Sequence, residues 1–245
     1  MKTSIVSAPT SNSRLSSQIK AVKFLSQPVR RSLLVCGIIS SLLYVTMNVV
    51  TAMVYAGYSS VSQTVSELSA IDAPTRPLWV SLAIVYSLLM ISFGFGVWQS
   101  SLSNRYLKIT GLLFIVNALI GLFWPPMHQR EVLAAGGGSL TDTMHIVFTI
   151  VTVPLMMLTI AFGAAALGKR FRLYSIITLT VLIFAGVLTG LESPNISKDL
   201  PTPSIGVWER INIGVYMLWV AMFSVSLLRK TKTGSIKNKT INLVS

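Results

Sequence analysis

Long apolar stretches alternate with short polar segments along this chain. No Asp, Glu, Lys or Arg occurs in residues 32–66, 77–104, 109–127 or 144–168. A helix needs roughly 20 apolar residues to cross the hydrocarbon core of a bilayer, and these stretches are about that long. The pattern predicts six membrane-spanning helices, at residues 32–56, 78–98, 107–124, 144–167, 175–191 and 211–228.

The predicted fold class is all-α, a polytopic transmembrane bundle of six helices. Lipid offers the backbone no hydrogen-bond partners, so helices satisfy it where open strands could not. The composition agrees, because 52% of the residues are hydrophobic and only 11% are charged. We expect a basic cytoplasmic tail at residues 1–31, a transmembrane domain at residues 32–228 and a second basic cytoplasmic tail at residues 229–245.

The charges are divided unequally between the segments that join the spans. Sixteen Lys and Arg residues fall in the two tails and in the connections that follow the second and fourth spans. The connections that follow the first, third and fifth spans hold four Lys and Arg residues and all seven acids. The positive-inside rule therefore predicts that both termini lie in the cytoplasm. The net charge of +13 then indicates anionic membrane lipids as partners rather than nucleic acid.

Neither end of the chain suggests another compartment. About thirty polar and basic residues precede the first span, which is unlike a cleaved secretory signal, and no strong mitochondrial import pattern is present. We therefore expect a multi-pass protein of the plasma membrane, the inner membrane of a bacterium. The single cysteine, Cys36, lies within the first span, so an intramolecular disulfide cannot form.

Polar residues are concentrated in the predicted outer connections and the adjoining helix ends. Val61, Val65 and Leu68 are spaced as on one helix face, which predicts a short helix lying on the outer surface. Asn48 and Asn117 lie in the outer halves of their spans. Amides in hydrocarbon are costly unless they are paired or solvated, so they indicate either a polar pocket that opens outward or isolated hydrogen bonds between helices.

The candidate catalytic residues are His145, Asp142 and Glu67. Asp142 and His145 are three residues apart at the start of the fourth span and share a helix face, so the carboxylate could orient the imidazole as a general base. In a second interpretation Asp142 only stabilises the helix N-terminus. A zinc site that includes His128 is a third, but no HxxxH or HxxH pair supports it, and we predict no metal.

The candidate ligand-binding residues include Arg210, Glu209 and Ser66, together with the two amides. Arginine suits an anionic ligand, although ion pairs between Arg210 and Glu67 or Asp142 are an alternative. Ser66 lacks the GxSxG setting of a hydrolase nucleophile. No P-loop, dinucleotide fingerprint, CxxC or haem motif occurs, so we predict no cofactor.

Three short motifs lie in the outer connections and the helix ends beside them. They are S-E-L at Ser66 and Glu67, a histidine at the head of the fourth span, His145, and G-x-x-E-R at Gly206, Glu209 and Arg210. These motifs resemble an uncharacterised prokaryotic family of six-pass membrane proteins, domain of unknown function 998. The resemblance covers about residues 30–230. It implies the six-helix fold and implies that Glu67, His145, Glu209 and Arg210 belong to one site.

These observations lead to three hypotheses about function. The first is a module that binds, senses or transports a small or lipid-borne ligand, recognised by Arg210 and His145. The second is a membrane-embedded hydrolase or transferase acting on a lipid or envelope substrate, with His145 as the base. The third is a structural or assembly protein in which the same residues form ion pairs.

Overall fold

The computed structural model describes the backbone of residues 25–244 and the side chains of residues 25–230. The first 24 residues, which form most of the predicted N-terminal tail, lie outside the described part. The described residues fold into helices joined by loops, with no strand among them. Six of these helices are long and apolar enough to cross a membrane, which confirms the all-α fold and the multi-pass membrane class.

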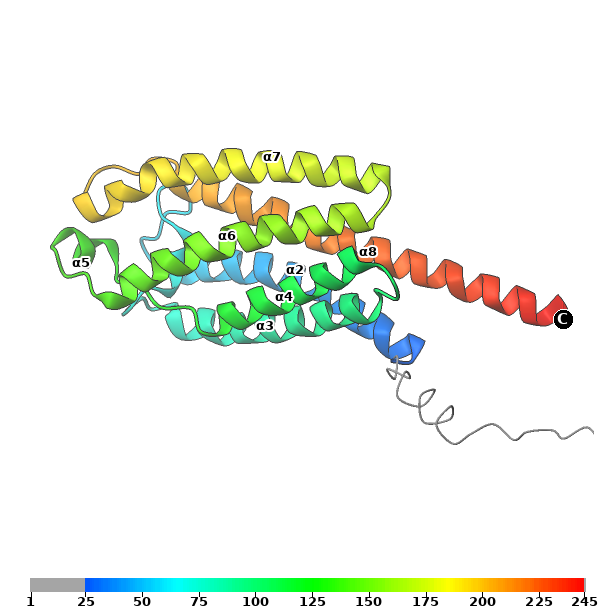
Figure 1. The fold of residues 1–245 in the computed structure, drawn as a ribbon. Coiled ribbons are helices and arrows are strands. Elements are labelled where there is room, and N and C mark those ends of the chain that lie inside the picture. Colours follow the sequence, from blue (N-terminus) through cyan, green and yellow to red (C-terminus); the bar gives the residue numbers. More distant parts are fainter. Residues whose placement is uncertain (1–24, 245) are drawn as a thin grey trace, which may run out of the picture.

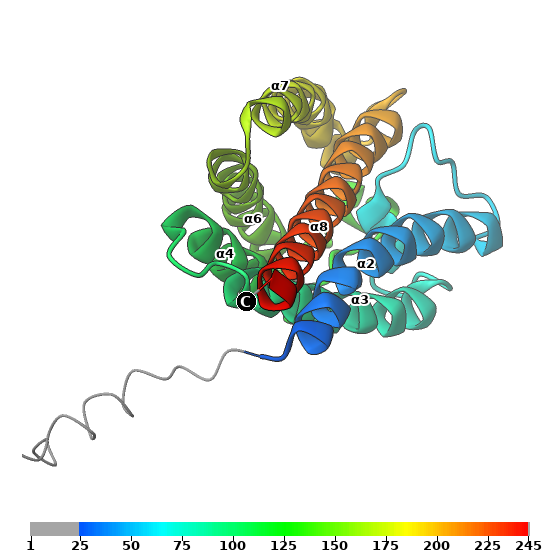
Figure 2. The same ribbon diagram turned by 90° about the vertical axis from the view of Figure 1, so that its right-hand side faces the viewer.

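The long helices form a ring in chain order (Figures 1 and 2). Each packs on its neighbour in the sequence, and α8 returns to pack on α2, which closes the ring. The six helices are α2 (Gln27–Val54), α3 (Arg76–Gln99), α4 (Arg105–Leu122), α6 (Leu140–Ala166), α7 (Lys169–Glu192) and α8 (Ile205–Val244).

Three short helices lie at one end of the ring, in the loops that were predicted to be external. They are η1 (Val65–Ser69), α5 (Arg130–Ala134) and η2 (Ser193–Lys198). The described chain begins and ends at the opposite end (Figure 1). The predicted surface helix is therefore present, but as a single turn of 3-10 helix that includes Val65 and Leu68 and leaves Val61 outside it.

Five of the six long helices are longer than the predicted spans, and the difference is largest for α7 and α8. α7 begins at Lys169 and α8 at Ile205, each six residues before the predicted span. Basic and polar residues can be helical where a helix leaves the hydrocarbon. Hydropathy therefore locates the membrane-embedded part of a helix rather than its ends. The extra turns place Glu209 and Arg210 within α8.

Aromatic side chains fill the centre of the bundle. The rings of Trp219 and Phe223 stack with centroids 5.0 Å apart, and Phe93 and Phe114 pack on the same cluster. The α6 backbone meets this cluster at Gly163, where an added Cβ would lie 2.7 Å from the Trp219 ring. The outward-facing side chains are apolar and exposed, as lipid contact requires, for example Leu42, Ile150 and Phe184.

Candidate functional site

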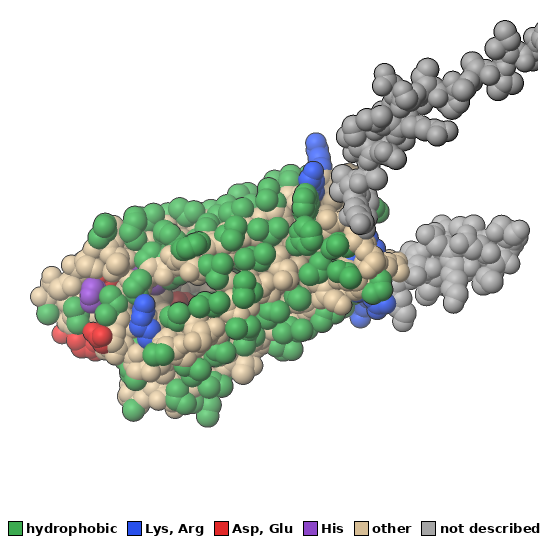
Figure 3. All heavy atoms as spheres, turned by 90° about the horizontal axis from the view of Figure 1, so that it is seen from below, with side chains coloured by type: hydrophobic (Ala, Val, Ile, Leu, Met, Phe, Trp, Pro, Cys, Tyr) green, Lys and Arg blue, Asp and Glu red, His purple; other side chains and the backbone are tan. Residues whose placement is uncertain are grey.

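Acidic and histidine side chains lie at the end of the molecule that carries the short helices, whereas most Lys and Arg side chains lie at the other end (Figure 3). The surface at the acidic end is hollowed beside a basic side chain. We call these the outer end and the basic end. All candidate residues from the sequence except Asn48 and Asn117 have their contacts at the outer end.

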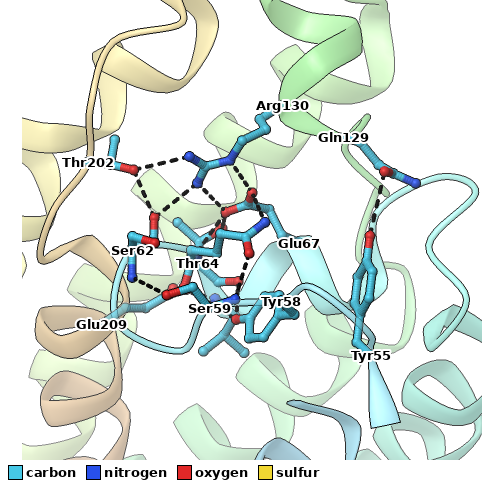
Figure 4. Close-up of polar contacts among 12 residues, drawn as sticks. Tyr55, Tyr58, Ser59, Ser62, Thr64, Glu67, Gln129, Arg130, Thr202 and Glu209 are labelled. Carbon is cyan, nitrogen blue, oxygen red and sulfur yellow. Dashed lines mark hydrogen bonds and ion pairs between the residues drawn. The ribbon is translucent and has the colours of Figure 1, made fainter. Parts of the chain in front are cut away.

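Glu67 is the centre of a network of hydrogen bonds at the outer end (Figure 4). Glu67 is 3% exposed, and its carboxylate accepts hydrogen bonds from Arg130 Nε at 2.6 Å and from Nη2 of the same guanidinium at 3.0 Å. The backbone N–H and hydroxyl of Thr64 donate to the same carboxylate at 2.6 and 2.9 Å. The hydrogen bond and ion pair with Glu67 raise the pKa of Arg130 above its ordinary value.

Arg130 joins three loops through the remaining donors of its guanidinium. It donates to the hydroxyl of Thr202 at 3.2 Å and to the carbonyl of Ser62 at 3.1 Å. Thr202 in turn donates to the same carbonyl. The segments before η1, around α5 and before α8 are therefore held together at one guanidinium (Figure 4).

Asp142 binds His128 and the start of its own helix. Its carboxylate accepts from the His128 backbone N–H at 2.7 Å, lies 2.8 Å from His128 Nδ1, and accepts from the N–H of Ser139 at 2.8 Å. Ser139 and Asp142 form a capping box at the N-terminus of α6. The predicted contact with the imidazole of His145 is absent from the hydrogen bonds of the described residues, because the loop turns His128 back onto this carboxylate.

His145 instead faces Ser66. Its Nε2 lies 3.0 Å from Ser66 Oγ, and its Nδ1 lies 2.8 Å from the carbonyl oxygen of Pro125. A carbonyl only accepts hydrogen bonds, so we assign the proton to Nδ1, which leaves Nε2 to accept from the serine hydroxyl.

Trp124 gives a conflicting contact at the same ring, because its Nε1 lies 3.1 Å from His145 Nδ1. A protonated Nδ1 cannot accept that N–H. Each tautomer leaves one unfavourable contact at Nδ1, either two N–H groups with their nitrogens 3.1 Å apart or a lone pair 2.8 Å from the Pro125 oxygen. We assign the proton to Nδ1 because the contact with the carbonyl is the shorter of the two. The indole then contacts the imidazole through ring packing, with an edge-on arrangement and centroids 5.4 Å apart.

Arg210 bonds to the loop that precedes η1. One guanidinium nitrogen donates to the carbonyls of Ser60, Gln63 and Gly206, and the other donates to the hydroxyl of Tyr58 at 2.6 Å. Burial raises the pKa of Tyr58 to about 12, so its hydroxyl stays protonated at neutral pH and donates in turn to the carbonyl of Thr64 at 2.7 Å.

Glu209 holds the first residue of η1. Its carboxylate accepts from the N–H of Val65 at 2.6 Å. Gly206, one turn earlier, donates its N–H to the Val61 carbonyl at 3.0 Å. An added Cβ at Gly206 would lie 2.5 Å from the Ser60 carbonyl oxygen, so only glycine allows α8 to approach the loop so closely.

Asn48 and Asn117 lie deeper in the bundle, away from this network. Asn48 is 7% exposed within α2. Asn117 donates to the carbonyl of Leu113 in its own helix and is 3.5 Å from the hydroxyl of Thr159 in α6, while its amide oxygen is buried without a partner among the described residues. No group of three His, Cys, Asp or Glu side chains in the described chain is placed to hold a metal ion.

A family model described as "Protein of unknown function (DUF998)" matches residues 38–226. The chain belongs to this family. The finding confirms the resemblance that the three short motifs indicated. No curated protein and no solved structure matches the chain.

The motifs that resembled the DUF998 family are in contact with one another in the folded chain. Gly206, Glu209 and Arg210 all bind the loop and first turn that carry Ser66, and Ser66 bonds to His145. Sequence reasoning missed Pro125, whose role depends on a backbone carbonyl and leaves no trace in residue type. It also gave Arg210 the ion-pair partners Glu67 and Asp142, whereas the structure pairs these acids with Arg130 and His128.

Proposed function

We propose that this protein is a membrane-embedded hydrolase or acyltransferase, with Ser66 as the nucleophile and His145 as the general base. The observation that supports this proposal is the 3.0 Å contact between Ser66 Oγ and His145 Nε2, with Nδ1 directed at the Pro125 carbonyl. Nucleophile, base and a third group that orients the base are the recurring parts of such sites.

The residues would act in two stages on an ester. Ser66 Oγ attacks the carbonyl carbon while its proton moves to His145 Nε2, and the resulting imidazolium keeps its Nδ1–H on the Pro125 carbonyl. Collapse of the tetrahedral intermediate breaks the bond to the leaving alcohol, which takes the proton from Nε2. Water, or a second alcohol, then removes the acyl group from Ser66 with His145 as the base again.

The location of the pair favours a lipid-borne or envelope ester as substrate. Ser66 is half-buried on η1, and His145 is 8% exposed in the second turn of α6. Ser66 lies in the loop between α2 and α3, and His145 lies near the start of α6 at the same end of the bundle, the depth at which the headgroups and ester groups of lipids would meet the protein. A substrate held in the membrane can reach this depth without leaving the bilayer.

The other candidate residues support the pair rather than offering groups to a ligand. Both terminal nitrogens of the Arg210 guanidinium donate within the protein, to Tyr58 and to three carbonyls, and Glu67 accepts from Arg130 and Thr64. Anion recognition by Arg210, which the binding or transport hypothesis requires, is therefore not favoured. These hydrogen bonds within the protein also favour a second candidate function, a purely structural outer cap. In such a cap the contact between Ser66 and His145 is one more stabilising hydrogen bond.

Labelling with a fluorophosphonate probe tests the enzymatic proposal, because such probes react with activated serine hydroxyls. The purified full-length chain should form an adduct on the peptide that contains Ser66. Ser66→Ala should abolish the adduct, and His145→Ala should slow its formation by at least about 100-fold, as expected for loss of a general base.

Ser62→Ala is the matched control, since Ser62 lies in the same loop and contributes its carbonyl to the network. This variant should label at the unmodified rate. Labelling that is absent, or that is unchanged in His145→Ala when the variant melts like the unmodified protein, would reject the enzyme and leave the structural cap.

A further inference from the structure

A second hollow lies at the basic end, far from the Ser66 site. It measures about 340 Å³ and is formed where α6 ends, α7 begins and α8 passes by. Its lining residues are Leu167, Gly168, Lys169, Arg170, Phe171, Ser226 and Lys230.

The lining combines an apolar wall with a cationic rim. Leu167 is 7% exposed, and Phe171 packs with the aromatic core. Lys169, Arg170 and Lys230 are exposed. Three cations around an apolar depression are suited to a molecule that carries a negative charge next to hydrocarbon.

The start of α7 adds backbone donors to the same rim. The first N–H groups of a helix have no intrahelical acceptor and carry the positive end of the helix dipole. Gly168 precedes this turn, and no atom beyond its two neighbours in the chain lies within 4 Å of the position that a Cβ would take there. A phosphate next to Lys169 and Arg170 could therefore also approach the backbone.

We propose that this hollow binds an anionic glycerophospholipid, with its phosphate on Lys169, Arg170 and Lys230 and its acyl chains along the apolar wall. The hollow lies where the spans leave the hydrocarbon, which is the depth of a lipid phosphate. The charge rule predicts that this end faces the cytoplasmic leaflet, where anionic lipids attract basic segments. The proposal is independent of the chemistry proposed for Ser66.

Native mass spectrometry of the full-length chain in detergent tests this site. Phosphatidylglycerol should remain bound under conditions that remove phosphatidylcholine. The triple variant Lys169→Gln, Arg170→Gln, Lys230→Gln should bind phosphatidylglycerol at least about tenfold more weakly, because each lost cation removes an attraction to the phosphate.

A triple variant outside the hollow separates a site from general attraction to a basic surface. Arg31, Lys108 and Arg172 are also exposed, and their replacement by Gln removes the same charge from the same end of the molecule. It should leave lipid retention within about twofold. Equal losses in both triple variants would overturn the proposal.

Two further results would also overturn it. One is equal retention of phosphatidylcholine and phosphatidylglycerol by the unmodified protein. The other is displacement of the lipid by glycerol phosphate at equal concentration, which would show that the site recognises a soluble phosphate without a membrane anchor. The tryptophan fluorescence of each variant checks that the core around Trp219 remains folded.

Discussion

At the scale of single residues, three acids of the outer end connect loops and helices through hydrogen bonds and ion pairs. Glu67 binds Arg130, Asp142 binds His128, and Glu209 binds the N–H of Val65. A buried polar group that loses its partner costs more than the hydrogen bond itself contributes. These contacts therefore fix the loops, and with them the position of Ser66 relative to His145.

Arg130→Met should destabilise the protein through the charge that it leaves behind. Glu67 is 3% exposed in the unmodified protein, and the variant would remove its counter-ion. Removing one partner of a buried ion pair costs about 3 to 5 kcal/mol, and we expect a loss at the lower end of that range because Arg130 is partly exposed. Thermal unfolding in detergent measures this loss. The double variant Glu67→Gln, Arg130→Met should recover part of it, because no unpaired charge is then buried.

Glu131→Gln is the control for this comparison, since Glu131 is adjacent to Arg130 in the chain and is exposed. Its melting temperature should stay close to that of the unmodified protein. An Arg130→Met protein that melts like the control would show that the pair contributes little and that other contacts hold the loops.

At the scale of elements, η1 is the part on which the proposed function depends. This single 3-10 turn is held by Glu209 from α8, by Arg130 from α5 and by His145 from α6. A turn so short has little stability of its own. The position of Ser66 is thus set by neighbouring helices together with the local capping box of Thr64 and Glu67.

Gly206→Ala should disturb η1 from a distance. The new methyl group would collide with the backbone carbonyls of Ser60 and Gln63, so α8 and the loop must move apart. Overpacking of this kind costs about 1 to 3 kcal/mol. We expect a lower melting temperature and slower fluorophosphonate labelling of Ser66, although residue 206 does not contact that hydroxyl.

Gly214→Ala is the matched control for this prediction. It lies two turns further along α8, and no atom outside its own helix lies within 4 Å of its added Cβ. Alanine is the better helix former, so this variant should be as stable as the unmodified protein or more so. Normal labelling in both variants would show that the approach of α8 does not position Ser66.

The six membrane-spanning helices were predictable from the sequence because hydrophobicity decides them. The side-chain contacts of the candidate site were not predictable. Uncharged stretches located all six spans, because a bilayer imposes length and polarity on each crossing. Residue spacing placed Asp142 and His145 on one face of α6, but it could not show that the loop returns His128 to Asp142. Nor could it show that Ser66, 79 residues before His145, reaches its imidazole.

At the scale of the whole molecule, the ring of helices keeps two chemically different ends apart. The outer end holds the acids, both histidines and Ser66, whereas the basic end holds the hollow lined by Lys169, Arg170 and Lys230. Their separation by the length of the spans means that each can be altered without touching the other. The side of the membrane that each end faces decides which substrates and lipids it meets.

Cysteine accessibility tests the predicted orientation. In a Cys36→Ser background, Lys198→Cys places a thiol at the outer end, on the last residue of η2, and Lys108→Cys places one at the basic end. Because sixteen of the twenty Lys and Arg residues belong to the tails and connections of the basic end, that end should stay in the cytoplasm. A membrane-impermeant maleimide should then label position 198 in intact cells and position 108 only after permeabilisation. The reverse pattern would place Ser66 in the cytoplasm, where an ester of the outer envelope could not reach it, and would move the proposed phospholipid site to the opposite leaflet.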